Sequence, residues 1–215
     1  DARDFVVIRN LEKLEHSDLS TTKISHYKGL GGTAYSDNDT TEYKADEIPE
    51  LAFSGRTEKS VTNSLKTLIL PNTLTSIGVL GITSCNKLTS VKCPKTLIKI
   101  YEMAFQDCTS LTEFEIGENV NYLGSQAFMR CSNLKTLIFN NLYADGLDAN
   151  TFSGCFSLKS IYVNTPTPTK FNSGKDLFSI IEADKSNITV FIKPGTLQLF
   201  KQDPNWNVFP NIVEL

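Results

Sequence analysis

A repeat of 23 residues constrains this chain more than any other feature of its sequence. The frame Leu-x-x-Leu-x-Leu, with some substitutions, begins at intervals of 23 or 24 residues from Leu65, Leu88, Leu111, Leu134 and Leu158. Later positions of the unit repeat as well, since Phe105, Phe128 and Phe152 each precede a cysteine by three residues. A spacing kept at several positions over four units predicts one structural unit that is stacked repeatedly.

Each unit is expected to contribute a short strand and then a turn segment. Leu68 and Leu70 alternate with Thr67 and Ile69, so both leucines face one side of the strand. Pro71 ends it, because proline donates no hydrogen bond to a ladder. One unit cannot bury its apolar side chains alone, whereas stacked units share a core. We therefore predict an α/β solenoid with a parallel β-sheet on one face and short helical or turn segments on the other.

The repeat predicts a single solenoid domain over residues 1–215. The regular repeats occupy 65–163, and residues 164–215 are expected to form the C-terminal repeat and cap. Residues 1–64 are expected to hold an N-terminal cap and a degenerate repeat, with an insertion over 25–46. We interpret this insertion as a surface loop, although such insertions sometimes carry a binding site.

Both ends of the stack need a cover, because an open end would expose apolar side chains and strand edges to water. A short helix or strand is expected within residues 1–10. Near the other end we predict a helical turn over 177–181, a last strand over 188–192 and a helix after Pro194. Three bulky residues are expected to close the C-terminal end of the core: Trp206, Phe209 and Ile212.

Composition and charge argue against two classes of partner. The net charge of −3 provides no basic face for nucleic acid. The sequence contains no run of about 18 apolar residues, so no membrane span is predicted.

Asp37, Asn38 and Asp39 lie in the insertion, but the calcium-loop spacing with its terminal glutamate is missing, so no metal is predicted.

The cysteines follow the repeat. Four of them occupy the same position of successive repeats: Cys85, Cys108, Cys131 and Cys155. The fifth, Cys93, replaces a core residue of a strand. No pair has the Cys-x-x-Cys spacing of a zinc site. We interpret the four as a buried ladder of small, soft side chains and predict five free thiols.

The sequence has no recognisable catalytic constellation. His16 and His26 are the only histidines, and neither lies near a nucleophile-elbow or zinc-protease motif. The glycines between 29 and 32 lack the Lys-Ser or Lys-Thr that follows in a phosphate loop. We therefore predict a protein that is no enzyme and that uses no cofactor.

The repeat resembles the BspA-like leucine-rich repeat family of bacterial surface proteins, as found in Bacteroidales. The positions that carry the resemblance in one unit are Leu88, Val91, Pro94, Leu97, Ile100, Phe105 and Cys108. The ending over 190–214 is similar to the terminal cap of that family, and residues 14–20 and 48–53 are similar to its opening. The pair at 81–82 departs from the pattern, since Gly-Ile stands where Ala-Phe is usual.

This resemblance implies a leucine-rich repeat fold and a non-enzymatic protein that is secreted or attached to the outer cell surface. It also implies adhesion, with a protein or glycan of a host or neighbouring cell as the partner. Members of such a family share their fold more reliably than they share a ligand. The polar start at Asp1 holds no signal peptide and is compatible with a mature exported chain. A purely structural module that displays or spaces another domain is the alternative function.

A candidate partner-binding patch lies on the solvent side of the predicted sheet. Its residues are Ile138, Tyr162, Phe191, Glu113 and Glu115. Period-2 alternation places the three apolar residues outside on successive rungs, with the two glutamates at the rim. Contiguous apolar patches often mark contact sites, and aromatic residues serve as interface anchors. The alternative is that residues 165–187 fold over this patch and bury it.

Overall fold

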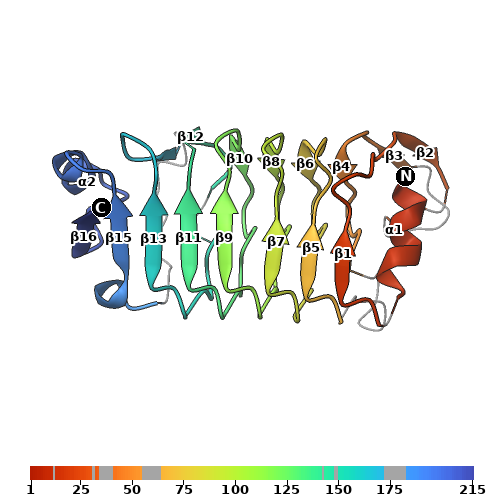
Figure 1. The fold of residues 1–215 in the computed structure, drawn as a ribbon, viewed down its shortest axis with the longest axis horizontal. Helices are drawn as coiled ribbons and strands as arrows, with labels where there is room; N and C mark the ends of the chain where they lie inside the picture. The colour runs from red at the N-terminus through yellow and green to blue at the C-terminus, as the bar shows by residue number, and fades with distance from the viewer. Residues whose placement is uncertain are drawn as a thin grey trace.

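The computed structural model describes residues 1–11, 13–30, 32–33, 41–54, 64–141, 143–147, 150–171 and 183–215. These residues form an elongated stack of rungs, with the N-terminus at one end and the C-terminus at the other (Figure 1). The predicted repeat fold with parallel sheets is confirmed. No helix within the described ranges is long and apolar enough to cross a bilayer.

The first strand of each rung builds one wall of the stack. In chain order these strands are β1 (His16–Asp18), β5 (Thr67–Ile69), β7 (Ser90–Lys92), β9 (Glu113–Ile116), β11 (Thr136–Phe139), β13 (Ser160–Val163), β15 (Thr189–Ile192) and β16 (Asn211–Glu214). Pairing joins equivalent positions of successive repeats, such as Leu137 with Ile161. From β9 to β15 the inward side chains are buried and the outward ones are not, as the alternation predicts.

Two features of this wall differ from the expectation. Hydrogen-bonded ladders join β1, β5 and β7 in one sheet and β9, β11, β13, β15 and β16 in a second, so no ladder connects β7 with β9. In addition, the predicted strand over 188–192 is not the last. β16 follows it and pairs in parallel with β15.

The opposite wall consists of shorter strands and turns. Its strands are β4 (Glu47–Ile48), β6 (Ser76–Ile77), β8 (Lys99–Ile100) and β10 (Tyr122–Leu123) in one parallel sheet, and β12 (Tyr143–Ala144) paired with β14 (Lys170–Phe171). The turns that follow hold non-glycine residues at φ between 55° and 61°: Leu80, Ser84, Met103, Asp107, Gln126 and Arg130. The left-handed backbone therefore recurs at two positions in three successive repeats without a glycine, and only the next repeat has a glycine at one of them, Gly154 with φ of 78°.

The core lies between the walls and repeats with them. The ring centroids of Phe105 and Phe128 are 5.2 Å apart, and those of Phe128 and Phe152 are 5.6 Å apart, with interplanar angles of 8° and 14°. All three side chains are fully buried. The aromatic position of the repeat thus forms a continuous stack along the axis of the molecule.

Each end of the core is covered. Helix α1 (Ala2–Arg9) closes the first end, where the Phe5 ring packs edge-on against Phe53 at 5.5 Å. At the other end lie the short 3₁₀ helix η2 (Lys185–Asn187) and α2 (Leu197–Gln202), which confirms the helix predicted after Pro194. Trp206 is fully buried there, as its predicted capping role requires. The helical turn predicted over 177–181 lies outside the described residues.

The insertion over 25–46 is more than the loop expected. It contains an antiparallel hairpin of β2 (Tyr27–Gly29) and β3 (Thr41–Tyr43), in which the rings of Tyr27 and Tyr43 stack at 6.2 Å. The guanidinium of Arg3 lies 4.7 Å from the centre of the Tyr27 ring. Cross-strand aromatic pairing and a cation–π contact stabilise the hairpin beside α1.

The cysteine ladder is buried and hydrogen-bonded. Thiols of successive rungs donate to main-chain carbonyls of the preceding rung, with Sγ–O distances of 3.2, 3.2 and 3.3 Å for Cys108, Cys131 and Cys155. All five cysteines are free in the structure. Burial raises the pKa of Cys85 and Cys155 to about 12.

We expect the native protein to resist alkylation, because the thiolate is the reacting species and burial keeps these groups protonated. Mass spectrometry after iodoacetamide treatment should show the four ladder cysteines unlabelled in the folded state. Denaturation without a reductant should then expose five reactive thiols. Only three labels after denaturation would mean that one disulfide exists and that the ladder interpretation is wrong.

Candidate functional site

The predicted apolar patch lies in register on the outer face of the second sheet. Ile138 pairs with Tyr162, and Tyr162 pairs with Phe191, on the adjacent strands β11, β13 and β15. All three side chains are partly exposed. The rings of Tyr162 and Phe191 stack on each other, with centroids 4.7 Å apart and an interplanar angle of 16°. The structure therefore brings together the three apolar residues that the sequence selected.

Strand β16 adds a fourth member, which sequence reasoning missed. Val213 pairs with Phe191 and is 43% exposed. The apolar pair Ile212 and Val213 between polar residues is a signal for this strand, but it is too short to identify one by itself. We call the four residues Ile138, Tyr162, Phe191 and Val213 the apolar row. The alternative of a covered patch depends on residues 165–187, of which 172–182 lie outside the described residues.

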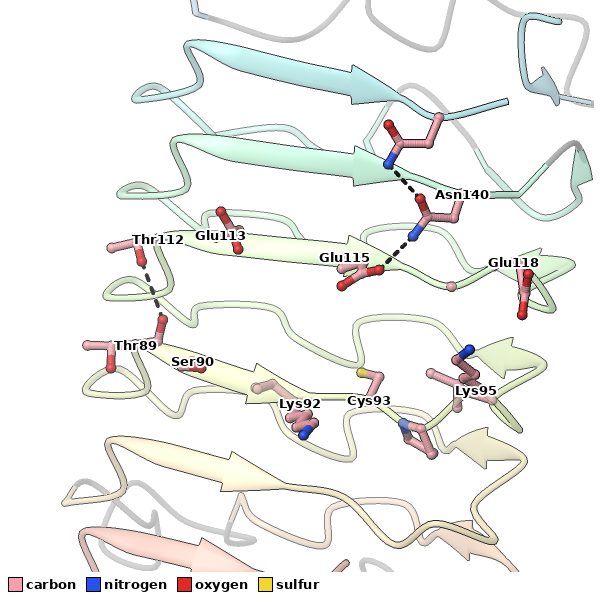
Figure 2. Close-up of a pocket in the computed structure, with 15 residues that line it drawn as sticks. Thr89, Ser90, Lys92, Cys93, Lys95, Thr112, Glu113, Glu115, Glu118 and Asn140 are labelled. Carbon is pink, nitrogen blue, oxygen red and sulfur yellow. Dashed lines mark hydrogen bonds between the residues drawn. The ribbon is translucent and has the colours of Figure 1, made fainter. Parts of the chain in front are cut away.

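The two glutamates predicted at the rim are exposed on β9. Glu115 pairs with Ile138 and so stands at the end of the apolar row, while Glu113 pairs with Thr136 in the neighbouring column. Glu115 is also part of a polar ladder that the sequence did not reveal. Asn140 Nδ2 donates to Glu115 Oε1 at 2.7 Å, and Asn164 Nδ2 donates to Asn140 Oδ1 at 2.8 Å (Figure 2).

A groove of about 900 Å³ opens on the same face where β7 and β9 are not paired. Figure 2 shows Lys92 and Lys95 on the rung of β7, and Glu113, Glu115 and Glu118 on the rung of β9. The groove therefore has a basic wall and an acidic wall. Its volume lies within the usual range of ligand pockets.

The groove reaches toward the core because β7 is less covered than its neighbours. Val91 and Cys93 are partly exposed, although their equivalents, Leu68 in β5 and Leu70 directly after it, are buried. On the other side, Phe114 occupies the inward strand position, with its ring 5.0 Å from Phe105 on the preceding rung. The two sheets part at the rung where this larger ring enters the core.

The two histidines lie in different parts of the fold, each beside one polar side chain. His16 Nδ1 lies 2.7 Å from Thr67 Oγ1, and His26 Nε2 lies 3.1 Å from Glu42 Oε1 on the hairpin. Both histidines are exposed. Across the described ranges, no three histidine, cysteine or acidic side chains are grouped so that they would hold a metal ion.

Comparison with known sequences identifies one family. The model of the family described as "BspA type Leucine rich repeat region" matches residues 46–179 in six copies. No curated protein sequence matches the chain.

Several solved structures are similar to the chain. A leucine-rich repeat protein of T. pallidum is 24% identical, with a TM-score of 0.43 over 54% of this chain and 51% of that one. A leucine-rich cell surface protein of Faecalibacterium prausnitzii A2-165 is 18% identical, with a TM-score of 0.48 over 77% and 42%. A leucine-rich repeat protein of Bacteroides ovatus ATCC 8483 is 18% identical, with a TM-score of 0.41 over 85% and 48%. The chain spans about half the length of these structures.

Proposed function

This chain belongs to the BspA-type leucine-rich repeat family, and on that premise we propose that it is a non-enzymatic interaction protein that binds another protein through the outer face of its sheet. The observation that carries the proposal is the apolar row. Four apolar side chains stand in register on adjacent strands where the repeat requires no apolar residue. A contiguous exposed row of this kind is typical of contact surfaces.

The geometry of the two rings favours a protein over a glycan. Sugars stack on the flat faces of aromatic rings, but Tyr162 and Phe191 cover one face of each other at 4.7 Å. Their other faces point along the row, toward the strands that carry Ile138 and Val213. The edges of the rings are left for a partner, and aliphatic or aromatic protein side chains pack well against such edges.

We further propose that the protein acts at the bacterial cell surface or outside the cell, in adhesion to a host or neighbouring cell. Membership of the family supports this proposal, because the repeat resembles that of exported bacterial surface proteins. The rim fits the same role, because the exposed carboxylates of Glu113 and Glu115 would attract a partner with basic residues beside its apolar contact.

The test is a triple variant that removes three of the four side chains of the apolar row and leaves the core unchanged: Ile138→Ser, Tyr162→Ser and Phe191→Ser. We expect binding to arrayed host-matrix and cell-surface proteins to be lost. The melting temperature should fall by no more than about 6 °C, which corresponds to about 2 kcal/mol for a chain of this size. A matched control changes the neighbouring polar column of the same strands: Thr136→Ala, Ser160→Ala and Thr189→Ala.

The control should retain both binding and stability. A much larger fall in melting temperature for the serine variant would show that the row belongs to the core and that the site lies elsewhere. Equal binding by the serine variant and the unaltered protein would show that the row is not the binding site. No binding by the unaltered protein would point instead to a structural module that displays or spaces another domain.

A further inference from the structure

We propose that the groove between β7 and β9 binds an extended peptide segment in which acidic and basic side chains alternate. This inference goes beyond the proposed function, because the charged walls of the groove lie on the rungs of β7 and β9, beside the apolar row, and share only the rim residues Glu113 and Glu115 with it. The groove would bind its peptide whether or not the apolar row contacts a partner. The argument depends on the charges of the two walls, on the hydrogen bonds missing between them, and on the geometry of an extended chain.

The two walls carry opposite charges at equivalent positions of the repeat. Lys92 and Glu115 are 23 residues apart, as are Lys95 and Glu118, and all four line the groove (Figure 2). Glu113 adds a further carboxylate to the acidic wall. The separation of the charges follows from the 23-residue period, which places one rung's lysines opposite the next rung's glutamates.

These opposite charges do not neutralise each other. In the described part of the chain, no ion pair joins a lysine of one wall to a glutamate of the other. Neighbouring rungs do form such pairs elsewhere, since Lys66 Nζ lies 2.9 Å from Glu15 Oε2, and Arg130 binds Asp107 through two contacts of 2.5 Å. The charges at the groove are therefore left available to a ligand.

The main chain at the groove also lacks bonds that neighbouring rungs have. The Leu70 N–H donates to Lys92 O, and the Asn140 N–H donates to Ile116 O, both at 3.0 Å. The equivalent hydrogen bonds between the rungs of β7 and β9 would be donated by the N–H groups of Cys93 and Gly117. Neither bond is present among the described residues. A main-chain hydrogen bond does join the two rungs just before β9, but it is long, with 3.5 Å between Thr112 N and Thr89 O. Polar main-chain groups thus line the groove together with the charges.

An extended peptide matches this arrangement. Successive side chains of a strand point to opposite sides, so alternating charges on a peptide lying along the groove would send all acids to one wall and all bases to the other. Residues two apart in such a peptide are about 6.6 Å apart, which is also the spacing between Glu113 and Glu115 along β9. Acidic side chains would face Lys92 and Lys95, and basic side chains would face the glutamates.

The experiment compares two capped hexapeptides of identical composition, Gly-Glu-Lys-Glu-Lys-Gly and Gly-Glu-Glu-Lys-Lys-Gly. Titration of the isotope-labelled protein, followed by amide chemical shifts, should show the alternating peptide perturbing Lys92, Glu115 and Gly117. The dissociation constant of the block isomer should be higher. Equal affinity of the two isomers, or no shift at millimolar concentration, would overturn the proposal.

Charge-removing variants locate the contacts. Lys92→Gln and Glu115→Gln should each weaken binding of the alternating peptide by about two- to fivefold, the usual range for one exposed charge pair. Glutamine at 115 keeps an oxygen that can accept from Asn140. The matched control is Lys135→Gln, an exposed lysine outside the groove, which should leave the affinity unchanged.

Two further outcomes would also overturn the proposal. Tighter binding of an all-acidic hexapeptide would identify a simple anion site at the lysines, and tighter binding of an all-basic one would identify a cation site at the glutamates. Because the probes are synthetic peptides and the apolar row is intact in every variant, these results are independent of the test of the proposed function.

Discussion

Replacing Phe128 with alanine is expected to lower the free energy of unfolding by about 3–5 kcal/mol, the usual cost of truncating a buried phenylalanine. The ring has no exposed surface and lies 5.2 Å from Phe105 and 5.6 Å from Phe152. It also contacts Phe114 at 4.6 Å. Truncation would leave a cavity in the middle of the stack, where rungs on both sides depend on the ring for burial.

Equilibrium denaturation in urea, followed by circular dichroism, measures this loss. Lys135→Ala is the control, because Lys135 is exposed and should change stability by less than about 0.5 kcal/mol. Similar losses at the two positions would mean that the inward and outward faces of the rung are assigned wrongly.

Replacing Gly124 with alanine is expected to cost about 3 kcal/mol, at the upper end of the usual range for overpacking. A methyl group here would lie 2.5 Å from the main-chain nitrogen of Glu102 and 2.7 Å from the carbonyl carbon of Tyr101. Both atoms belong to the preceding rung, and its main chain cannot move without disturbing its own hydrogen bonds. The close approach of successive rungs at this turn therefore requires glycine.

Gly117→Ala is the matched control for this substitution. The nearest atom to its added methyl group would be Val120 Cγ2 at 4.0 Å, which is ordinary contact. We expect a change of less than about 0.5 kcal/mol at this position. Thermal unfolding of both variants measures the difference, and an equal loss at 117 and 124 would contradict the proposed close packing of rungs.

Much of the fold was predictable because the repeat encodes it locally. The Leu-x-x-Leu-x-Leu frame places Leu137 on the inner side of its strand and Ile138 on the outer side, and the constant period then brings equivalent residues of successive rungs side by side. The same alternation places Ile138, Tyr162 and Phe191 on one face of the sheet, and the strand register makes them neighbours. The helix after Pro194 followed from local signals of the same kind.

The sequence by itself thus determined the type of rung, the register between rungs and the outward position of Ile138, Tyr162 and Phe191. These properties depend on the order of residues within one repeat. Tertiary structure alone decided where the sheet is interrupted, because the separation of β7 from β9 depends on how side chains of different rungs fill the space between them, as Phe114 does beside Phe105. It also decided that β16 extends the row by Val213, since a short strand forms only where a neighbour offers a free edge to pair with.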